Sequence, residues 1–154
     1  MRDICAVERA SFPDPYSLEV LSYLIKAHQG HFFVAADHGR IVGYISASED
    51  AGQGHVLSIA VDPHHRRLRI ATALLATVTA KLAEEGVELM RLEVRRGNTA
   101  AIAFYKQMGY RESGEVRHYY ADGEDALVLA RSMRRVREAT TGATGRRART
   151  ALGP

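Results

Sequence analysis

The spacing of apolar and polar residues predicts a chain that alternates between helices and strands. Residues 70–85 place apolar side chains at intervals of three and four, as in a helix with one buried face, and this pattern stops at Gly86. Residues 31–37 and 40–48 have the composition of strands, and the His-Gly pair between them is a hairpin turn signal. The first half of the chain therefore favours antiparallel pairing.

Caps and helix breakers define the remaining elements. Pro13 and Pro15 end a first helix over residues 3–11, and Ser17 is a typical N-cap for a second helix that runs to about His28. The other predicted elements are strands over 54–62, 89–94, 110–118 and 125–133 and a helix over 98–108. Since early hairpin strands are followed by a strand-helix-strand unit, we predict an α+β fold with a mixed sheet.

The composition limits the class of protein. A chain of 154 residues fits one domain, and no apolar run is long enough to span a bilayer. The first ten residues lack the apolar core of a signal peptide. Cys5 is the only cysteine, so no internal disulfide can form. These features predict a cytoplasmic protein without a membrane association.

The basic charge is concentrated in the last 21 residues. Residues 134–154 hold six arginines and one glutamate, whereas residues 1–133 carry 15 of the 21 basic and 17 of the 18 acidic side chains. The segment 134–154 has no apolar periodicity, so we predict a domain over 1–133 and a basic, disordered tail over 134–154. Such a tail either stays solvated or contacts ribosomal RNA through phosphates.

The connection between the third strand and the third helix predicts a phosphate site. The strand ends at Asp62-Pro63, an Arg-rich turn follows, and a helix opens at Ile70. Free backbone N–H groups and the helix dipole favour an anion at such a helix start. Arg66, Arg67 and Arg69 add positive charge there. We therefore expect a phosphorylated ligand.

Four ordered stretches give the chain a family resemblance. They are GHVLSIAV (54–61), HRRLRIAT (65–72), LEVRRGNTAAIAFY (92–105) and YYADGEDA (119–126). With them the chain resembles the GNAT-fold acetyltransferases, and within these the protein N-terminal acetyltransferases. It is similar to the archaeal enzymes related to the NatA catalytic subunit and to bacterial RimI. The resemblance implies a GNAT fold with splayed central strands and transfer of an acetyl group from acetyl-CoA to N-terminal amines of nascent or ribosomal proteins.

The resemblance also implies the donor site. The pyrophosphate of acetyl-CoA would bind backbone N–H groups of the turn, and the pantetheine arm would pair with the edge of the third strand. Asn98 would contact the donor, and part of the helix after it would line the thioester end. The residues so assigned are Ile59, Ala60, Val61, Arg67, Leu68, Arg69, Ile70, Ala71, Thr72, Asn98, Ala103, Phe104 and Tyr105.

For the chemistry, the resemblance assigns Glu93 and His55 as a water-linked pair of bases and Tyr105 as the acid that protonates the leaving thiolate. An α-amine has a pKa of about 8, so its deprotonation asks little of the base. No functional metal is expected, since acetyl transfer needs none. His64 and His65, which precede the turn, are expected to face solvent.

The acceptor would lie between the turn at 12–16 and the segment at Tyr119-Tyr120. The resemblance implies that Tyr16 and Tyr120 hydrogen-bond the peptide backbone, while Phe12 and Pro13 form an apolar pocket for the first side chain. An apolar pocket favours termini of the Met-Leu type, and Asp14 would supply the acidic residue of relatives that accept small first residues.

Two departures from the family pattern stand out. Arg69 occupies a position where glycine is usual, and glycine permits a positive φ or a close approach to phosphate. We expect binding of the donor to be retained with altered affinity. The family also usually opens with a strand, whereas here a helix is predicted almost from Met1, so either that strand is missing or the true start lies upstream. Without that strand, residues 31–37 would form an apolar edge open to another chain.

Two other functions remain open at this stage. A GNAT acting on a small amine or a lysine side chain would share the donor site but not the two-tyrosine groove. A non-catalytic ribosome- or RNA-binding module would use the arginines of the tail. No specific DNA binding is expected.

Overall fold

The computed structural model describes residues 1–133, and the predicted basic tail lies outside these described residues. The secondary structure follows the predicted order closely. The helices and strands are α1 (Arg2–Ser11), α2 (Leu18–Ala27), β1 (Phe32–Asp37), β2 (Arg40–Asp50), β3 (Gln53–Val61), α3 (Ile70–Glu84), β4 (Leu89–Arg95), α4 (Thr99–Gln107), β5 (Arg111–Val116) and β6 (Ala126–Ser132). Two short 3₁₀ turns, Gln29–His31 and Pro63–His65, precede β1 and α3. Ser17 caps α2 by accepting from the Val20 N–H, as expected.

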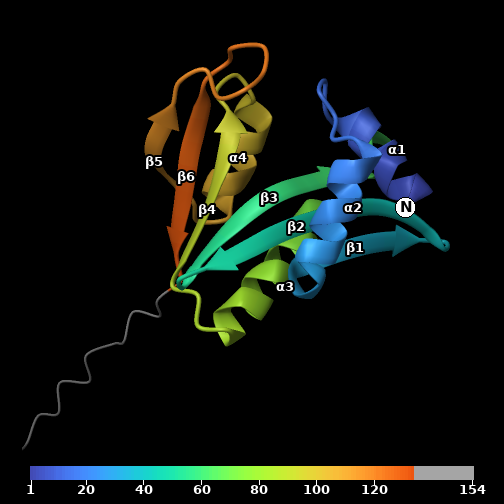
Figure 1. Ribbon diagram of the computed structural model, residues 1–154, viewed down its shortest axis with the longest axis horizontal. Coiled ribbons are helices and arrows are strands. Elements are labelled where there is room, and N and C mark those ends of the chain that lie inside the picture. Colours follow the sequence, from blue (N-terminus) through green and yellow to red (C-terminus); the bar gives the residue numbers. More distant parts are fainter. Residues whose placement is uncertain (134–154) are drawn as a thin grey trace, which may run out of the picture.

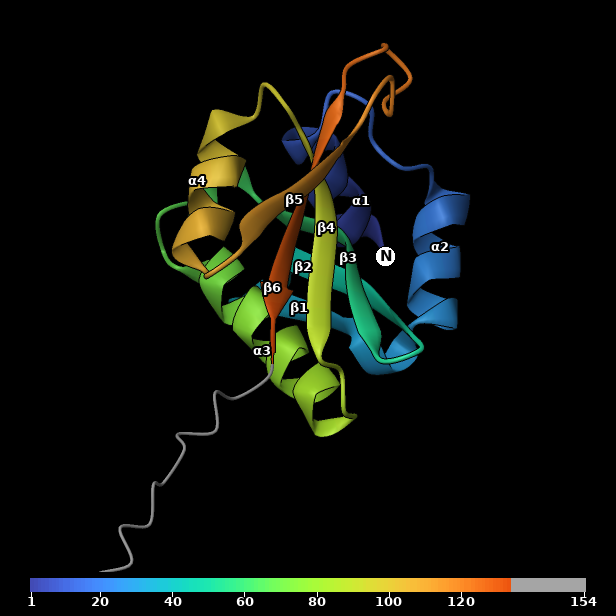
Figure 2. The same ribbon diagram turned by 90° about the vertical axis from the view of Figure 1, so that its left-hand side faces the viewer.

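A six-stranded sheet in the order β1-β2-β3-β4-β6-β5 forms the centre of the molecule. All pairings are antiparallel except that of β3 with β4. Helices α1 and α2 cover one face, and α3 and α4 lie on the other (Figure 2). The predicted α+β mixed sheet is therefore confirmed. No helix described in residues 1–133 is long and apolar enough to cross a membrane.

The sheet opens at its middle. Strands β3 and β4 pair only at Gln53–His55 with Leu89–Arg91, and beyond these residues they diverge (Figure 1). The opening separates a half made of β1–β3 from a half made of β4–β6. The rest of β3 pairs with no strand other than β2 in the described chain, so its second edge is open to a ligand, except that the Val61 carbonyl accepts from Ser11 Oγ at 3.4 Å.

A bulge in β3 lies where the two strands separate. The register with β2 shifts between Ser46↔Ser58 and Ala47↔Val56, which leaves Leu57 as the extra residue. A bulge bends its strand and increases its twist. It therefore turns the second half of β3 away from β4.

Close packing fixes the end of the sheet that stays closed. A Cβ on Gly54 would clash with the buried Met90 sulfur of the neighbouring strand, so a larger residue here would displace that side chain from the core. Most of the buried apolar side chains between the sheet and α3 and α4 form one cluster that takes members from both halves. A smaller cluster lies under α1 and α2. At one margin of the sheet, β1 is an edge strand with Val34 46% exposed.

Candidate active site

The turn between β3 and α3 forms a cavity of about 340 Å³ at the open edge of β3. Its lining residues are Val61, His65, Arg66, Arg67, Arg69, Ile70, Ala71, Thr72 and Phe104. Asp62 stabilises the start of the turn, since its carboxylate accepts from the His64 N–H. Helix α3 begins at Ile70, so its first N–H groups lie at this cavity. A phosphate group fits this combination of free donors and arginines.

The conformation of the turn explains why glycine is usual at position 69. Arg69 has a φ of 60° and Arg67 a φ of 65°, both in the left-handed region. Such backbone costs about 1 kcal/mol for a residue with a Cβ. The position therefore does require a positive φ, and Arg69 adopts it at that cost. In the described part of the chain, no ion pair involves any of the three arginines of the turn, so their charge is available to an anion.

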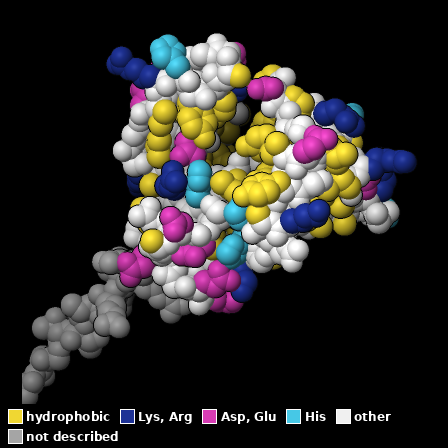
Figure 3. All heavy atoms as spheres, in the orientation of Figure 1, with side chains coloured by type: hydrophobic (Ala, Val, Ile, Leu, Met, Phe, Trp, Pro, Cys, Tyr) yellow, Lys and Arg dark blue, Asp and Glu magenta, His cyan; other side chains and the backbone are white. Residues whose placement is uncertain are grey.

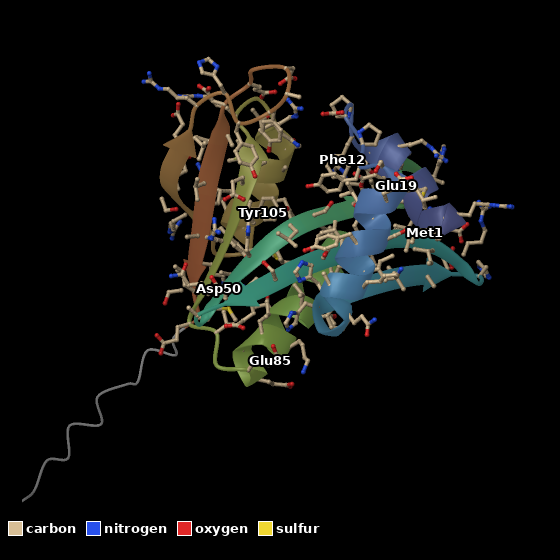
Figure 4. The ribbon with its side chains drawn as sticks, in the orientation of Figure 1. Met1, Phe12, Glu19, Asp50, Glu85 and Tyr105 are labelled. Carbon is tan, nitrogen blue, oxygen red and sulfur yellow. The ribbon has the colours of Figure 1, made fainter. Side chains whose placement is uncertain are left out.

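Helix α4 supplies the apolar end of the donor side. Phe104 lines the cavity, and Tyr105 is buried behind it with its ring 5.2 Å from that of Phe104. Burial raises the pKa of the Tyr105 phenol above its ordinary value, and the hydroxyl therefore stays protonated at neutral pH. Tyr105 lies beside β4 across the opening from Phe12 (Figure 4).

A pair of side chains on β3 and β4 forms the centre of the acceptor side. His55 Nε2 lies 2.5 Å from Glu93 Oε2, and Arg91 Nη1 donates to Glu93 Oε1 at 2.9 Å. The two residues contact each other directly, so no water is needed to link them. The His55 hydrogen bond lowers the pKa of the Glu93 carboxyl, and the charges of His55 and Arg91 act in the same direction against burial. Glu93 is thus a carboxylate at neutral pH.

Strand alternation places these groups opposite Tyr105. On β4, Met90, Leu92 and Val94 are buried in the cluster under α3 and α4, so Glu93 and its neighbours Arg91 and Arg95 point to the other face. Tyr105 belongs to that buried cluster. Glu93 and Tyr105 therefore lie on opposite faces of the sheet.

Two segments with tyrosines border the acceptor side. Tyr16, in the turn after α1, is 43% exposed, and Tyr119 and Tyr120 lie in the loop between β5 and β6. Burial raises the pKa of all three phenols, and the charge of Glu93 acts in the same direction; the pKa of Tyr120 is raised to about 12. The surface between the two halves is hollowed and rimmed by apolar side chains (Figure 3).

Arg95 holds the loop that carries Tyr120. Its guanidinium carbon lies 4.0 Å from the centre of the Tyr120 ring, and its Nη1 donates to Asp122 at 2.8 Å and to Glu124 at 2.7 Å. Glu124 also accepts from the Gly97 N–H. These contacts explain why Arg95 and the acidic residues of the YYADGEDA stretch occur together in this chain.

The other residues assigned from the resemblance differ in their exposure and contacts. Ala103 and Leu68 are exposed and do not line the cavity. Asn98 uses its side-chain oxygen to cap α4 by accepting from the Ala101 N–H. His65 does not simply face solvent, because its side chain is 28% exposed and lines the cavity; His64 is exposed as expected.

On the acceptor side, Phe12 is half-buried against the cluster under α1, and Pro13 is exposed. The contacts of Arg91 and Arg95 were missed. Arg91 and Arg95 share the polar face of β4 with Glu93, and this period-two pattern is visible in the sequence.

Comparison with known proteins agrees with this geometry. The Acetyltransferase (GNAT) family model matches residues 1–110. An N-alpha-acetyltransferase of Sulfurisphaera tokodaii is 39% identical over 82% of this chain and 84% of its own length. The N-terminal acetyltransferase A complex catalytic subunit NAA10 of Arabidopsis thaliana is 36% identical over 79% of this chain and 67% of its own.

Among solved structures, Ard1 from Thermoplasma volcanium superposes with a TM-score of 0.80 at 30% identity, covering 85% of this chain and 91% of that one. The opened sheet, the turn before α3 and these matches lead to one conclusion. The chain belongs to the GNAT family of acetyltransferases, enzymes that use an acyl-CoA donor.

Proposed function

We propose that this enzyme transfers the acetyl group of acetyl-CoA to the free α-amine of protein N-termini. The observation that carries the proposal is the contact of His55 with Glu93 at the opening of the sheet, bordered by Tyr16 on one side and Tyr120 on the other. Relatives named as N-alpha-acetyltransferases support the choice of substrate.

The donor would lie in the cavity before α3 and along the free edge of β3. Backbone N–H groups of Arg67 to Thr72 and the nearby guanidiniums would hold its phosphates. Ile59, Ala60 and Val61 would pair with its amides in the way that an added strand pairs with a sheet edge. Phe104 and Tyr105 would enclose its reactive end. Asn98, the N-cap of α4, would contact the donor.

In the reaction a bond forms between the amine nitrogen and the acyl carbon, and the carbon–sulfur bond breaks. The amine must lose a proton and the sulfur must gain one. Glu93 Oε2 lies within hydrogen-bond distance of His55 Nε2, and the pair accepts the proton of the amine directly or through one water. The Tyr105 phenol, kept protonated by burial, supplies the proton to sulfur.

The acceptor peptide would lie between the two tyrosine segments. Tyr16 and Tyr120 would hydrogen-bond its first backbone groups, and Phe12 and Pro13 would border its first side chain. This pocket favours termini of the Met-Leu type, with Asp14 extending the range toward small first residues.

The remaining parts of the proposal concern the substrates of the enzyme, its location and its contacts with the ribosome. Nascent or ribosomal proteins would be substrates in the cytoplasm. The arginines of residues 134–154, outside the described part of the chain, would add ribosome contacts through RNA phosphates.

Acetyl transfer to a panel of short peptides tests the proposal. The panel begins with Ser, Ala, Met-Leu and Met-Glu, and an N-blocked peptide with an internal lysine is the control. We expect turnover on free α-amines and none on the blocked peptide. Turnover on the blocked peptide alone would assign the enzyme to lysine acetylation instead.

A further inference from the structure

Glu8 is a buried carboxylate that the proposed reaction does not use. It is 2% exposed and lies on the inner face of α1 with Ile4 and Val7. Among residues 1–133, no basic side chain lies within ion-pairing distance of it. Burying a carboxylate without a cation is costly, and an apolar residue would suit this stripe better. The position therefore needs an explanation beyond the packing of α1.

One oxygen of Glu8 holds the turn that carries Tyr16. The Tyr16 N–H donates to Glu8 Oε1 at 2.9 Å. Two of the four residues at 13–16 are prolines, which have no N–H. In the described structure this is the one hydrogen bond that ties residues 13–16 to the rest of the domain. The placement of Tyr16 consequently depends on Glu8.

The other oxygen connects Glu8 to the opened strand. The Tyr44 phenol donates a short hydrogen bond to Glu8 Oε2, and it also contacts Ser58 Oγ at 2.9 Å. Tyr44 stacks on Phe32 with 5.4 Å between ring centres, which holds it rigidly in the sheet. Ser58 follows directly on the bulge where β3 leaves β4. Glu8 thus spans from the bulge to the turn.

We propose that Glu8 is a positioning residue, which sets the turn at 12–16 at a fixed distance from the opening so that a bound peptide meets Glu93 and His55. The inference rests on the proposed function insofar as this turn is taken as a wall of the peptide site. Glu8 acts through hydrogen-bond geometry, so glutamine, whose side-chain oxygen still accepts from Tyr16, replaces it. Leucine, which fills similar space without accepting, does not.

Steady-state kinetics with the best peptide of the panel tests the proposal. For Glu8→Leu we expect the peptide KM to rise about tenfold, the effect of losing one hydrogen bond that orders a binding segment. The KM for acetyl-CoA should stay within about twofold, because the donor cavity contains no part of α1. Glu8→Gln should restore the peptide KM to within about threefold of the original value. A peptide KM unchanged in Glu8→Leu, or a donor KM that rises equally, would overturn the proposal.

Amide hydrogen exchange provides a readout that does not depend on activity. In Glu8→Leu the Tyr16 amide should exchange about tenfold faster or more, while amides within α1 keep their protection. Val7→Ala, a core truncation in the same helix, is the matched control and should leave the Tyr16 amide and the peptide KM unchanged. If the original protein acetylates no peptide, the proposed function fails, but Tyr16 exchange still decides the role of Glu8. Unchanged exchange in an active enzyme overturns the positioning role alone.

Discussion

The donor side of the opening is built mainly from main-chain groups and apolar side chains, whereas the acceptor side is built from charged side chains that contact one another. The turn before α3 offers N–H groups and holds its arginines without carboxylate partners in the described chain. Across the sheet, Glu93 contacts both His55 and Arg91, and Arg95 contacts two carboxylates and a tyrosine.

This difference matters for how each side tolerates change. A donor that a whole family shares can be bound by main-chain N–H groups, because any sequence that forms the turn provides them. An acceptor that differs between enzymes must be recognised by side chains. Substitutions on the acceptor side should therefore affect turnover and peptide binding, and those on the donor side should have small effects.

The largest expected effect is on chemistry at Glu93. Glu93→Gln removes the carboxylate of the pair that accepts the proton of the amine, so kcat should fall about a hundredfold, within the usual range for a general base. The dissociation constant of CoA, measured by calorimetry, should stay within about twofold. An equal loss of CoA binding would show that the two sides are not separable in the way described.

Tyr105 tests the donor side for a contribution to chemistry. A thiolate with a pKa near 8.5 is a moderately good leaving group, so Tyr105→Phe should lower kcat only about tenfold. Because burial raises the pKa of this phenol, it stays protonated as pH rises past its ordinary value, and kcat should show no alkaline fall below about pH 10 from this group. Phe104→Leu, which keeps the apolar lining, is the control for packing. A fall in kcat near pH 8 that disappears in Tyr105→Phe would contradict the assignment.

Arg95 tests the loop that carries Tyr120, on the acceptor side, without changing the reacting groups. Arg95→Met removes the contacts to Tyr120, Asp122 and Glu124, so the peptide KM should rise about fivefold at low salt with the donor KM unchanged. Since the two carboxylates are partly exposed, added salt should weaken peptide binding more in the original enzyme than in the variant. Lys106→Met, which breaks the exposed pair with Glu112, is the matched control. Equal peptide KM values for the original enzyme and Arg95→Met would show that Arg95 does not contribute to peptide binding.

Arg69 should give the smallest effect. Arg69→Gly relieves the left-handed backbone but deletes one of several cations, so the dissociation constant of CoA should rise only about threefold, and less at high salt. Arg69→Asn separates the two causes, because asparagine tolerates this backbone without being as free as glycine. A gain in affinity of tenfold or more with glycine would mean that Arg69 obstructs the turn.

Much of the fold was predictable because its signals are local. Ser17 as a cap, the prolines after α1 and the apolar interval of residues 70–85 each report on a few neighbouring residues, and the elements follow them. The bulge at Leu57 and the divergence of β3 from β4 are set by contacts between distant strands, which periodicity does not record. The resemblance implied the divergence of the central strands, and nothing in the sequence indicated the bulge.

For the site, the sequence indicated candidate residues but not the contacts between them. Glu93, His55 and Tyr105 were named through the resemblance. The direct contact of Glu93 with His55, and the position of Tyr105 on the other face of the sheet, depend on tertiary packing. Glu8 was missed because a glutamate on a short helix is usually solvated. A signal existed, since Ile4, Val7 and Glu8 stand at i, i+3 and i+4 and so share one face of the helix.

The short ladder between β3 and β4 also bears on how the domain folds. Three residue pairs alone cannot make six strands melt as one unit, yet α3 and α4 lie on a single buried cluster drawn from both halves, with Ile45 and Val56 on one side and Leu92 and Leu129 on the other. Unfolding cooperativity is thus carried by the apolar layer beneath the sheet instead of by its hydrogen bonds. The sheet can therefore be open between β3 and β4 while the domain still unfolds as one cooperative unit.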